Sequence, residues 1–541
     1  MPAFDVTEYP YSSRRNVVFA RKAMACTSIP QGAQIGLDVM KTGGNAVDAA
    51  VAMAAAMPLL EPTGNGLGGD CFALVWMEKE KRLYGLNASG TAPAAIDAER
   101  VRALGIAQMP KTGWLSTLVP GAPAGWAELN HRFGTRPLSE LFAPAIRSAR
   151  EGVPVAVNLE AIWKADCRRI QGAMGENPAP HAYWWEKFTK NGEPYRAGDI
   201  FYWEEYARTM EELAATGCES YYRGSIMEKI VSFSRRTGGY FSEEDFSSYR
   251  PIWVEPITTE YRGYTVCEIP PNGLGITALM ALNILRGVEM PLERECAETY
   301  HKIIEALKLA FADTQAYIAD PRYMRTRAEN LLSEDYAARR RALMGETALL
   351  PKTGDPSCGG TIYLCTADTA GNMVSLIQSN YTAFGAGVAV PDTGISFQNR
   401  GAGFSLDLDS DNCLAGGKRP AHTILPGFLL KAGEAVGPFG VMGGFMQPQG
   451  HVQVVVNTVD YHMNPQSALD APRFQWTGKK RVQLEREVPV HIARELSRRG
   501  HEVEIVSSNL NMGRGQIIWK TDNGLYIGGT EPRCDGTVAA W

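Results

Sequence analysis

The sequence predicts one mixed α/β body in which a helical first part and a strand-rich second part are interleaved. Residues 136–350 are largely helical by hydrophobic periodicity, as in Ala297–Ile318, with loops such as Ile269–Gly275 between the helices. Near residue 350 the pattern changes, and β-prone segments follow. Because no low-complexity linker separates the two parts, a single interleaved domain is favoured over two independent ones.

The amino-acid composition limits the kinds of molecule that the protein is expected to bind. The 541 residues are 45% hydrophobic and 21% charged, which is typical of a globular protein with a large core. The 54 basic residues against 59 acidic ones give a net charge of −5, so no basic excess indicates binding to nucleic acid or to an anionic membrane. The first residues lack a basic region followed by an apolar one, so we expect a cytoplasmic protein without a membrane partner.

Several elements of the first part can be placed by pattern. Residues 32–57 predict two helices broken at Gly43–Asn45, with Asp48 early in the second helix. Cys71–Met77 has the apolar run of a buried strand. Residues 84–95 contain Gly, Asn, Ser and Pro, and they predict a loop.

The second part begins after a loop-forming stretch, Pro351–Gly360, which shows no periodicity. A helix-like run covers Gln449–Val456. The predicted strands are Thr361–Ala367, Met373–Ser379, Gly394–Gln398 and Gly440–Gly443.

The first two of these strands predict a hairpin. Asp368–Asn372 is rich in turn residues, and a hairpin symmetric about Ala370 places Thr361 directly opposite Ser379. Directly opposed residues have Cβ atoms about 5 Å apart, so the two hydroxyl groups can form a hydrogen bond. A β-bulge would shift this register.

Thr361 is also a candidate nucleophile. The preceding Gly359 and Gly360 give a conformationally free backbone, and the Thr361 hydroxyl could attack its own preceding carbonyl. Hydrolysis of the resulting ester would leave Thr361 as a new N-terminus, whose amine, with a pKa of about 7.7–8.0, is a suitable general base. Gly-Gly-Thr alone usually marks only the start of a strand, so a wider pattern is needed.

That wider pattern resembles the γ-glutamyltranspeptidase family, whose motifs occur in order along most of the chain. The nucleophile hairpin of the family is similar to residues 361–387. The other matching motifs are GLDVMKTGGNAVDAAVAMAAAM (36–57), GNGLGGDCF (64–72), PGAPAGW (120–126), YYRG (221–224), PPNG (270–273), EALKLAFAD (305–313), TGISFQNRGAGFS (393–405), GKRPAHTILP (417–426), VMGGF (441–445) and APRFQW (471–476).

The resemblance implies a four-layer αββα fold, in which two packed sheets are flanked by helices, and self-cleavage between Gly360 and Thr361. It implies a large segment 1–360 and a small segment 361–541, which together form an αβ heterodimer, with a dimer of heterodimers as a further option. Thr361 matches the nucleophile, and Ser379 matches a second hydroxyl that assists processing. Gly443 and Gly444 match the backbone donors of the oxyanion hole.

The residues that hold a γ-glutamyl group in the family differ here. The Arg that binds its α-carboxylate reads Ser89, and the Asp that binds its α-amine reads Gly403. The paired Ser residues of another substrate contact read His422 and Thr423. A neutral Ser cannot replace a bidentate Arg–carboxylate contact, so the chemistry is retained while the usual substrate clamp is not.

Other residues of these motifs are substrate-binding candidates. Arg400 either binds a carboxylate from another direction or forms a surface ion pair. His422 either lines the pocket or is structural, and it is not needed as a base because the terminal amine fills that role. Tyr381 and Asn399 complete the candidate set with Thr423.

Nothing in the sequence requires a cofactor or a metal. The ten cysteines contain no CxxC, and the eight histidines show no metal-ligand spacing. Gly64-x-Gly66-x-x-Gly69 matches the dinucleotide fingerprint only formally, because a helix is predicted before it and a strand after it. We therefore expect chemistry without a cofactor.

The sequence thus predicts an autoprocessing threonine hydrolase or acyltransferase of the γ-glutamyltransferase type that cleaves a γ-glutamyl or related small acidic amide. One alternative is an amidohydrolase or acylase of different specificity, acting on oxamate or glutaryl amides. Another is an unprocessed, non-catalytic homologue. A transferase acting on poly-γ-glutamate would keep the same nucleophile but need an extended acceptor groove.

Overall fold

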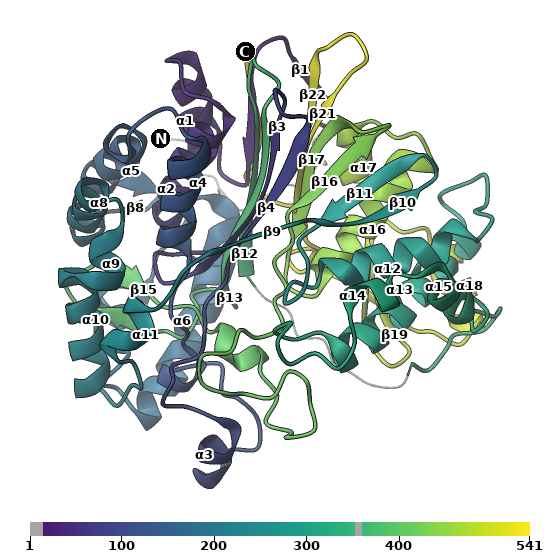
Figure 1. Cartoon of the computed structure of the whole chain (residues 1–541). Coiled ribbons are helices and arrows are strands. Elements are labelled where there is room, and N and C mark those ends of the chain that lie inside the picture. Colours follow the sequence, from purple (N-terminus) through teal and green to yellow (C-terminus); the bar gives the residue numbers. More distant parts are fainter. Residues whose placement is uncertain (1–13, 352–359) are drawn as a thin grey trace, which may run out of the picture.

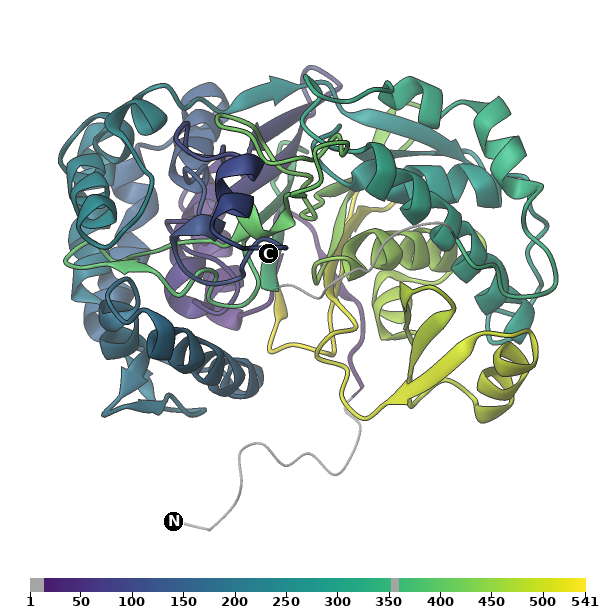
Figure 2. The ribbon, with the colours of Figure 1, turned by 90° about the horizontal axis from the view of Figure 1, so that it is seen from below.

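Two antiparallel seven-stranded sheets stack face to face at the centre of the molecule, and helices cover the outer face of each (Figure 1). The computed structural model describes residues 14–351 and 360–541. The predicted four-layer αββα architecture is therefore confirmed. Seen along the perpendicular direction, the two helical layers flank the sheets as separate lobes (Figure 2).

The strand order of the first sheet is β1 (Val18–Ala20), β22 (Tyr526–Thr530), β21 (Arg514–Lys520), β17 (Glu434–Met442), β16 (Gly427–Lys431), β11 (Tyr264–Glu268) and β10 (Ile257–Tyr261). The order of the second is β23 (Thr537–Ala540), β2 (Met24–Thr27), β12 (Gly360–Ala367), β13 (Met373–Tyr381), β3 (Asp70–Met77), β4 (Arg82–Ala88) and β9 (Ile252–Val254). Both sheets combine strands from before and after Thr361, so the two parts of the chain are interleaved as predicted.

The helices before residue 250 are α1 (Pro30–Lys41), α2 (Ala46–Leu60), α3 (Ala98–Ala103), α4 (Ala122–Phe133), α5 (Leu138–Glu151), α6 (Val157–Glu176), α7 (Ala182–Phe188), α8 (Glu204–Thr216), α9 (Glu219–Arg223), α10 (Ser225–Arg236) and α11 (Glu243–Ser247). The later ones are α12 (Gly275–Arg286), α13 (Ala297–Tyr317), α14 (Ala328–Leu331), α15 (Glu334–Arg341), α16 (Met446–Val459), α17 (Pro465–Asp470) and α18 (Val490–Arg498). Most of the first set lie on one side of the sheets, and α12–α16 and α18 lie on the other (Figure 1).

Short pairings lie outside the two main sheets. They are β5 (Val153–Pro154) with β8 (Ile200–Phe201), β6 (Thr189–Lys190) with β7 (Glu193–Pro194), β14 (Ala389–Val390) with β15 (Ile395–Ser396), and the three-stranded set β18 (Phe474–Gly478), β19 (Arg481–Glu485) and β20 (Glu502–Val506). None of the helices in the described part of the chain combines the length and apolar character needed to cross a membrane.

Helix α2 shows how the sequence specifies this core. Asn45 caps it, accepting hydrogen bonds from the N–H groups of Val47 and Asp48, while the Asp48 carboxylate accepts from the N–H of Asn45. This capping box satisfies donors that a helix start leaves unpaired. All residues of α2 are buried, which agrees with a helix that is apolar or small on every side.

Three predictions need correction. Residues 84–88 form the end of β4 rather than a loop, because pairing with β3 and β9 on both sides outweighs the turn propensity of Gly85 and Asn87. Residues 252–268, in the stretch predicted to be largely helical, form β9, β10 and β11. Of the predicted strand Gly394–Gln398, only Ile395–Ser396 is a strand. Residues 352–359 of the predicted loop before Thr361 lie outside the described residues.

Candidate active site

The hairpin of β12 and β13 carries the predicted nucleophile. Residues 362–367 pair with β13 in the predicted symmetric register. The register then shifts between Gly360 and Ile362, so that Gly360 pairs with Tyr381. Thr361 therefore lies at an irregularity of the β-ladder, where the backbone departs from regular pairing.

Thr361 and Ser379 nevertheless lie side by side. Thr361 is 1% exposed, and its Oγ1 lies 3.1 Å from the Oγ of Ser379. The Ser379 oxygen accepts hydrogen bonds from the backbone N–H of Tyr381 at 2.8 Å and from the Arg400 guanidinium at 3.4 Å. Either hydroxyl can act as the donor in the contact between Ser379 and Thr361. The predicted proximity is confirmed, while the catalytic role stays a prediction.

Gln447, in the first turn of α16, is a second donor to the same oxygen. Its Oε1 accepts from the backbone N–H of Leu425 at 3.0 Å, which fixes the orientation of the amide. Its Nε2 then donates to Thr361 Oγ1 at 3.3 Å. The sequence interpretation missed this residue, although its position three residues after Gly444 and just before the predicted helical run Gln449–Val456 was a usable signal.

Gly443 and Gly444 connect the end of β17 to the start of α16. Their φ angles are 134° and 61°, which glycine adopts without strain. A Cβ on Gly443 would lie 3.1 Å from the Cα of Gly513, so a side chain there would be crowded. The two glycines directly precede the N-terminal end of α16, the positive end of the helix, and Gln447 of its first turn contacts Thr361. Their oxyanion role stays a prediction.

Arg400 lies on the other side of Ser379, and it is buried rather than part of a surface ion pair. Its side chain is 1% exposed. One terminal nitrogen donates to Thr423 Oγ1 at 2.7 Å, the other donates to Ser379, and the guanidinium carbon lies 4.1 Å from the centre of the Tyr381 ring. Burial lowers the pKa of Arg400 to about 10, so the group remains a cation at neutral pH.

Tyr381 and Asn399 shape the loop that follows β13. Tyr381 has a φ of 77°, in the left-handed region, which turns the chain directly after Ser379. The Asn399 amide donates to the backbone carbonyl of Lys111 at 2.7 Å and to the Thr382 hydroxyl at 2.5 Å, and its oxygen accepts from the Thr382 N–H. Asn399 therefore holds this loop in place, which is a positioning role.

His422 is held by Asp70, a residue that the sequence interpretation missed. Its Nε2 donates to Asp70 Oδ2 at 2.7 Å, and its Nδ1 accepts from the N–H of Ile424 at 3.4 Å. The other Asp70 oxygen accepts from Gln398 at 2.7 Å and from the N–H of Gly90 at 2.6 Å. Burial lowers the pKa of His422 to about 4, so the ring is neutral at physiological pH. The structural interpretation of His422 fits these contacts.

The two positions that differ from the family clamp have different surroundings. Ser89 is fully buried, donating to Asn87 Oδ1 at 2.7 Å and accepting from Asn272 Nδ2 at 3.3 Å. At Gly403 a Cβ would meet only the carbonyl oxygen of Ala421, at 3.7 Å. Gly403 therefore has room for a side chain, and the missing carboxylate is not a consequence of crowding.

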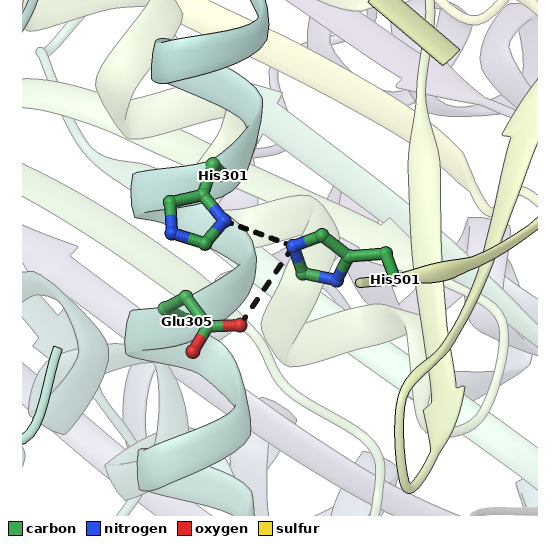
Figure 3. Close-up of side chains that lie close together, drawn as sticks. All are labelled: His301, Glu305 and His501. Carbon is green, nitrogen blue, oxygen red and sulfur yellow. Dashed lines mark hydrogen bonds and ion pairs between the residues drawn. The ribbon is translucent and has the colours of Figure 1, made fainter. Parts of the chain in front are cut away.

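A separate buried cluster contains ligand-type side chains that sequence spacing did not indicate (Figure 3). The ligand atoms of His301, Glu305 and His501 lie within 4.8 Å of one another. Lys308 Nζ lies 2.7 Å from Glu305 Oε1 and 3.3 Å from His501 Nδ1. An ammonium only donates, so His501 Nδ1 accepts, and its Nε2–H donates to His301 Nδ1 at 2.9 Å. Lys308 thus already supplies the positive charge of this cluster.

The cluster also anchors the chain ahead of the undescribed segment. The N–H of Leu349 donates to Glu305 Oε2 at 2.9 Å, and its carbonyl accepts from Lys308 at 3.1 Å. His501 comes from the second part of the chain, so the cluster joins residues from before and after Thr361. Burial lowers the pKa of His501 to about 3, which agrees with a neutral ring beside Lys308.

Comparison with known proteins places the chain in a family. Residues 32–541 match the family described as Gamma-glutamyltranspeptidase. The chain is 33% identical to the glutathione hydrolase-like YwrD proenzyme of Bacillus subtilis over 96% of this chain and 99% of that protein. It is 32% identical to the oxamate amidohydrolase proenzyme of Klebsiella pneumoniae, over 94% and 96%.

Comparison with a solved structure supports the same family assignment. The crystal structure of cephalosporin acylase from Bacillus halodurans superposes with a TM-score of 0.96 at 51% identity, covering 100% of this chain and 99% of that one. The match extends over both sheets and both helical layers. The chain is therefore a member of the gamma-glutamyltranspeptidase family of hydrolases and acyltransferases.

Proposed function

We propose that the chain cuts itself between Gly360 and Thr361 and then uses Thr361 as the N-terminal nucleophile of an amidohydrolase. The observation that carries this proposal is the buried Thr361 oxygen, which lies 3.1 Å from Ser379 Oγ and 3.3 Å from Gln447 Nε2. Gln447 donates to this oxygen and the Ser379 hydroxyl can also donate to it, so both can stabilise the negative charge that develops during attack.

Self-cleavage begins with Thr361 Oγ1 attacking the carbonyl carbon of Gly360. The C–N bond breaks, the nitrogen takes a proton and becomes the α-amine of Thr361, and an ester joins Gly360 to Oγ1. Water then hydrolyses this ester, which leaves a carboxylate on Gly360 and restores the hydroxyl. The irregular β-ladder at Thr361 supports this step, because the bond to be cut is not held in a regular pairing.

The mature enzyme repeats the attack on a substrate amide. The Thr361 amine, with a pKa of about 7.7–8.0, accepts the hydroxyl proton and passes it to the leaving amine. The N–H groups of Gly443 and Gly444 are proposed to hold the oxyanion, where losing one donor costs about 3 kcal/mol of barrier. Water, or an amine in transfer, then releases the acyl group from the enzyme.

The proposed mature form is a cytoplasmic αβ heterodimer of residues 1–360 and 361–541, alone or as a dimer of such heterodimers. β12 is paired on one side with β2, from the first segment, so the segments stay associated after cleavage. The substrate is a small acidic amide, and a relative named as an oxamate amidohydrolase supports it. A γ-glutamyl substrate is the second candidate, favoured by the relatives named as glutathione hydrolases.

Denaturing electrophoresis with N-terminal sequencing tests the proposal. We expect two bands, the smaller beginning at Thr361, and ammonia release from an acidic amide. The Thr361→Ala variant should give one band and no activity. A wild-type chain that stays intact on incubation and releases no ammonia would instead support a non-catalytic homologue.

A further inference from the structure

Arg400 is a buried cation whose contacts in the described part of the chain are all to uncharged groups. Its partners are the hydroxyls of Ser379 and Thr423 and the ring of Tyr381, all of them uncharged. Among the described residues, no carboxylate lies within 4.0 Å of its nitrogens, and its buried Nε has no hydrogen-bond partner. A buried charge without a partner is costly unless a ligand supplies one.

The closest candidate within the chain is already engaged. Asp70 exerts an electrostatic influence on Arg400, but its two oxygens accept hydrogen bonds from His422, Gln398 and the N–H of Gly90. The described residues therefore offer Arg400 no available carboxylate, and an anionic ligand can supply one. A planar guanidinium with a free N–H edge matches a carboxylate.

The position of Arg400 limits how far this carboxylate lies from the bond being cut. The guanidinium nitrogen is 3.4 Å from Ser379 Oγ, which is 3.1 Å from Thr361 Oγ1, so the nitrogen lies at most 6.5 Å from the nucleophile. An attacking oxygen sits about 3 Å from the carbonyl carbon, and a charge-assisted hydrogen bond spans about 2.8 Å. These contacts need not lie on one line, but they fix the amide carbon and the carboxylate at two points a short distance apart. A short acyl chain can join these points, whereas a longer chain would have to bend.

We propose that Arg400 binds the substrate carboxylate and that the substrate is the monoamide of a short dicarboxylic acid of two to four carbons. This inference rests on the proposed function, since it assumes that Thr361 attacks the amide. The substrate carries no α-ammonium group, because Gly403 offers no carboxylate to bind one. Ser89 cannot bind a carboxylate as the Arg of the family does at this position. Arg400 makes that contact instead, from a different direction.

The first experiment measures ammonia release from a homologous series. Oxamate, malonamate, succinamate and glutaramate are each compared with the uncharged diamide of the same length. We expect kcat/KM to be highest among the shorter monoamides and to exceed that of the matching diamide by about 10- to 100-fold. Equal rates for monoamides and diamides, or a clear maximum at glutaramate, would overturn the inference.

The second experiment changes the cation. Arg400→Met should raise the KM of the best monoamide about 10- to 100-fold more than it raises the KM of the matching diamide. Arg400→Lys should give an intermediate ratio, because lysine keeps the charge but cannot form the two parallel hydrogen bonds of a guanidinium. The exposed Arg168 provides the matched control, Arg168→Met. An equal loss on both substrates would mean that Arg400 is structural, and the inference would fail.

A binding measurement separates this inference from the proposed function. Calorimetric titration of oxalate and malonate needs no catalysis, and we expect binding to the wild type and to Arg168→Met but not to Arg400→Met. A chain that never cuts itself and hydrolyses no amide would defeat the proposed function, yet this titration would still decide the role of Arg400. Binding that survives in Arg400→Met, or is absent from the wild type, would overturn it.

Discussion

Two arginines are fully buried in this protein, and their surroundings differ in one respect. Arg473, 2% exposed, pairs with Glu531 at 2.7 Å and donates to two backbone carbonyl groups. Glu531 also pairs with Arg533, which in turn pairs with Glu485. Arg400, 1% exposed, has among the described residues two neutral hydroxyls and an aromatic ring as its polar and cation–π partners. Arg473 thus belongs to a cluster in which carboxylates balance the arginines, whereas Arg400, beside the predicted nucleophile, has no carboxylate partner among the described residues.

Replacing each arginine by methionine tests this contrast most strongly. Arg473→Met leaves Glu531 with one partner fewer in the interior, and we expect a loss of about 3–5 kcal/mol in the free energy of unfolding. Arg400→Met removes a charge that has no partner, so the free energy of unfolding should fall by less than about 1 kcal/mol or even rise. Urea denaturation in the uncleavable Thr361→Ala chain measures both. Equal losses in the free energy of unfolding for the two variants would contradict the proposed difference between a paired and an unpaired buried arginine.

Acid should destabilise the protein through two buried neutral histidines, His422 and His501. His422 and His501 have pKa values lowered by burial to about 4 and about 3, against an ordinary value of 6.5. Between pH 6.5 and the lowered pKa of each histidine, the unfolded chain binds more protons than the folded one. The contribution of these histidines to the free energy of unfolding is therefore fully present above about pH 6.5 and falls as the pH drops toward 4. Each histidine contributes a slope of up to about 1.4 kcal/mol per pH unit.

Denaturation midpoints between pH 4 and 7 measure this slope. His501→Gln should flatten the profile, while the same change at the exposed His491 should leave it unaltered. A profile of the wild type that is flat across this range would contradict the neutral state assigned to the rings.

Gln447→Glu tests the hydrogen bond that Gln447 donates to Thr361. The variant keeps an acceptor for the Leu425 N–H but loses the donor to Thr361 Oγ1. We expect self-cleavage to slow by about tenfold, which corresponds to about 1.4 kcal/mol of barrier, the size of one hydrogen bond. The time course of precursor loss on gels measures it. A cleavage rate equal to that of the wild type would show that the Gln447 contact is not used.

Gly403→Asp is expected to have the smallest effect. Space is available at this position, so the unfolding free energy should change by less than about 1 kcal/mol. The new carboxylate offers a partner to an α-ammonium, and activity on a γ-glutamyl amide should rise several-fold relative to succinamate. An unchanged ratio of the two activities would place residue 403 away from the bound acyl group.

The sequence predicted best those structural features that depend on residues close together in the chain. The symmetric turn predicted the register of β12 and β13, and Asn45 with Asp48 predicted the start of α2. The bulge at Thr361 was not predictable, because it depends on packing around the hairpin. β4 was missed because its Gly and Asn favour turns in isolation, while pairing on both sides stabilises the strand.

Contacts between distant parts of the chain were the main omission. His301 and His501 are separated by 200 positions, so no spacing rule could join them. Asp70 is 352 positions from His422, and its role appears only once β3 is placed in the sheet. For Arg400 the sequence left a surface ion pair and a carboxylate contact open, and only burial in the folded chain excludes the first.

The interleaved sheets have a consequence for how this protein can be produced. Strand β12, which begins at the bond to be cut, has β2 on one side and β13 on the other, and β2 also borders β23 from the C-terminus. Residues 1–360 and 361–541 made as two separate polypeptides would each expose unpaired strand edges, which are templates for aggregation. We therefore expect the continuous chain to assemble more efficiently than two separate halves, and co-expression of the halves to be a poor substitute for the precursor.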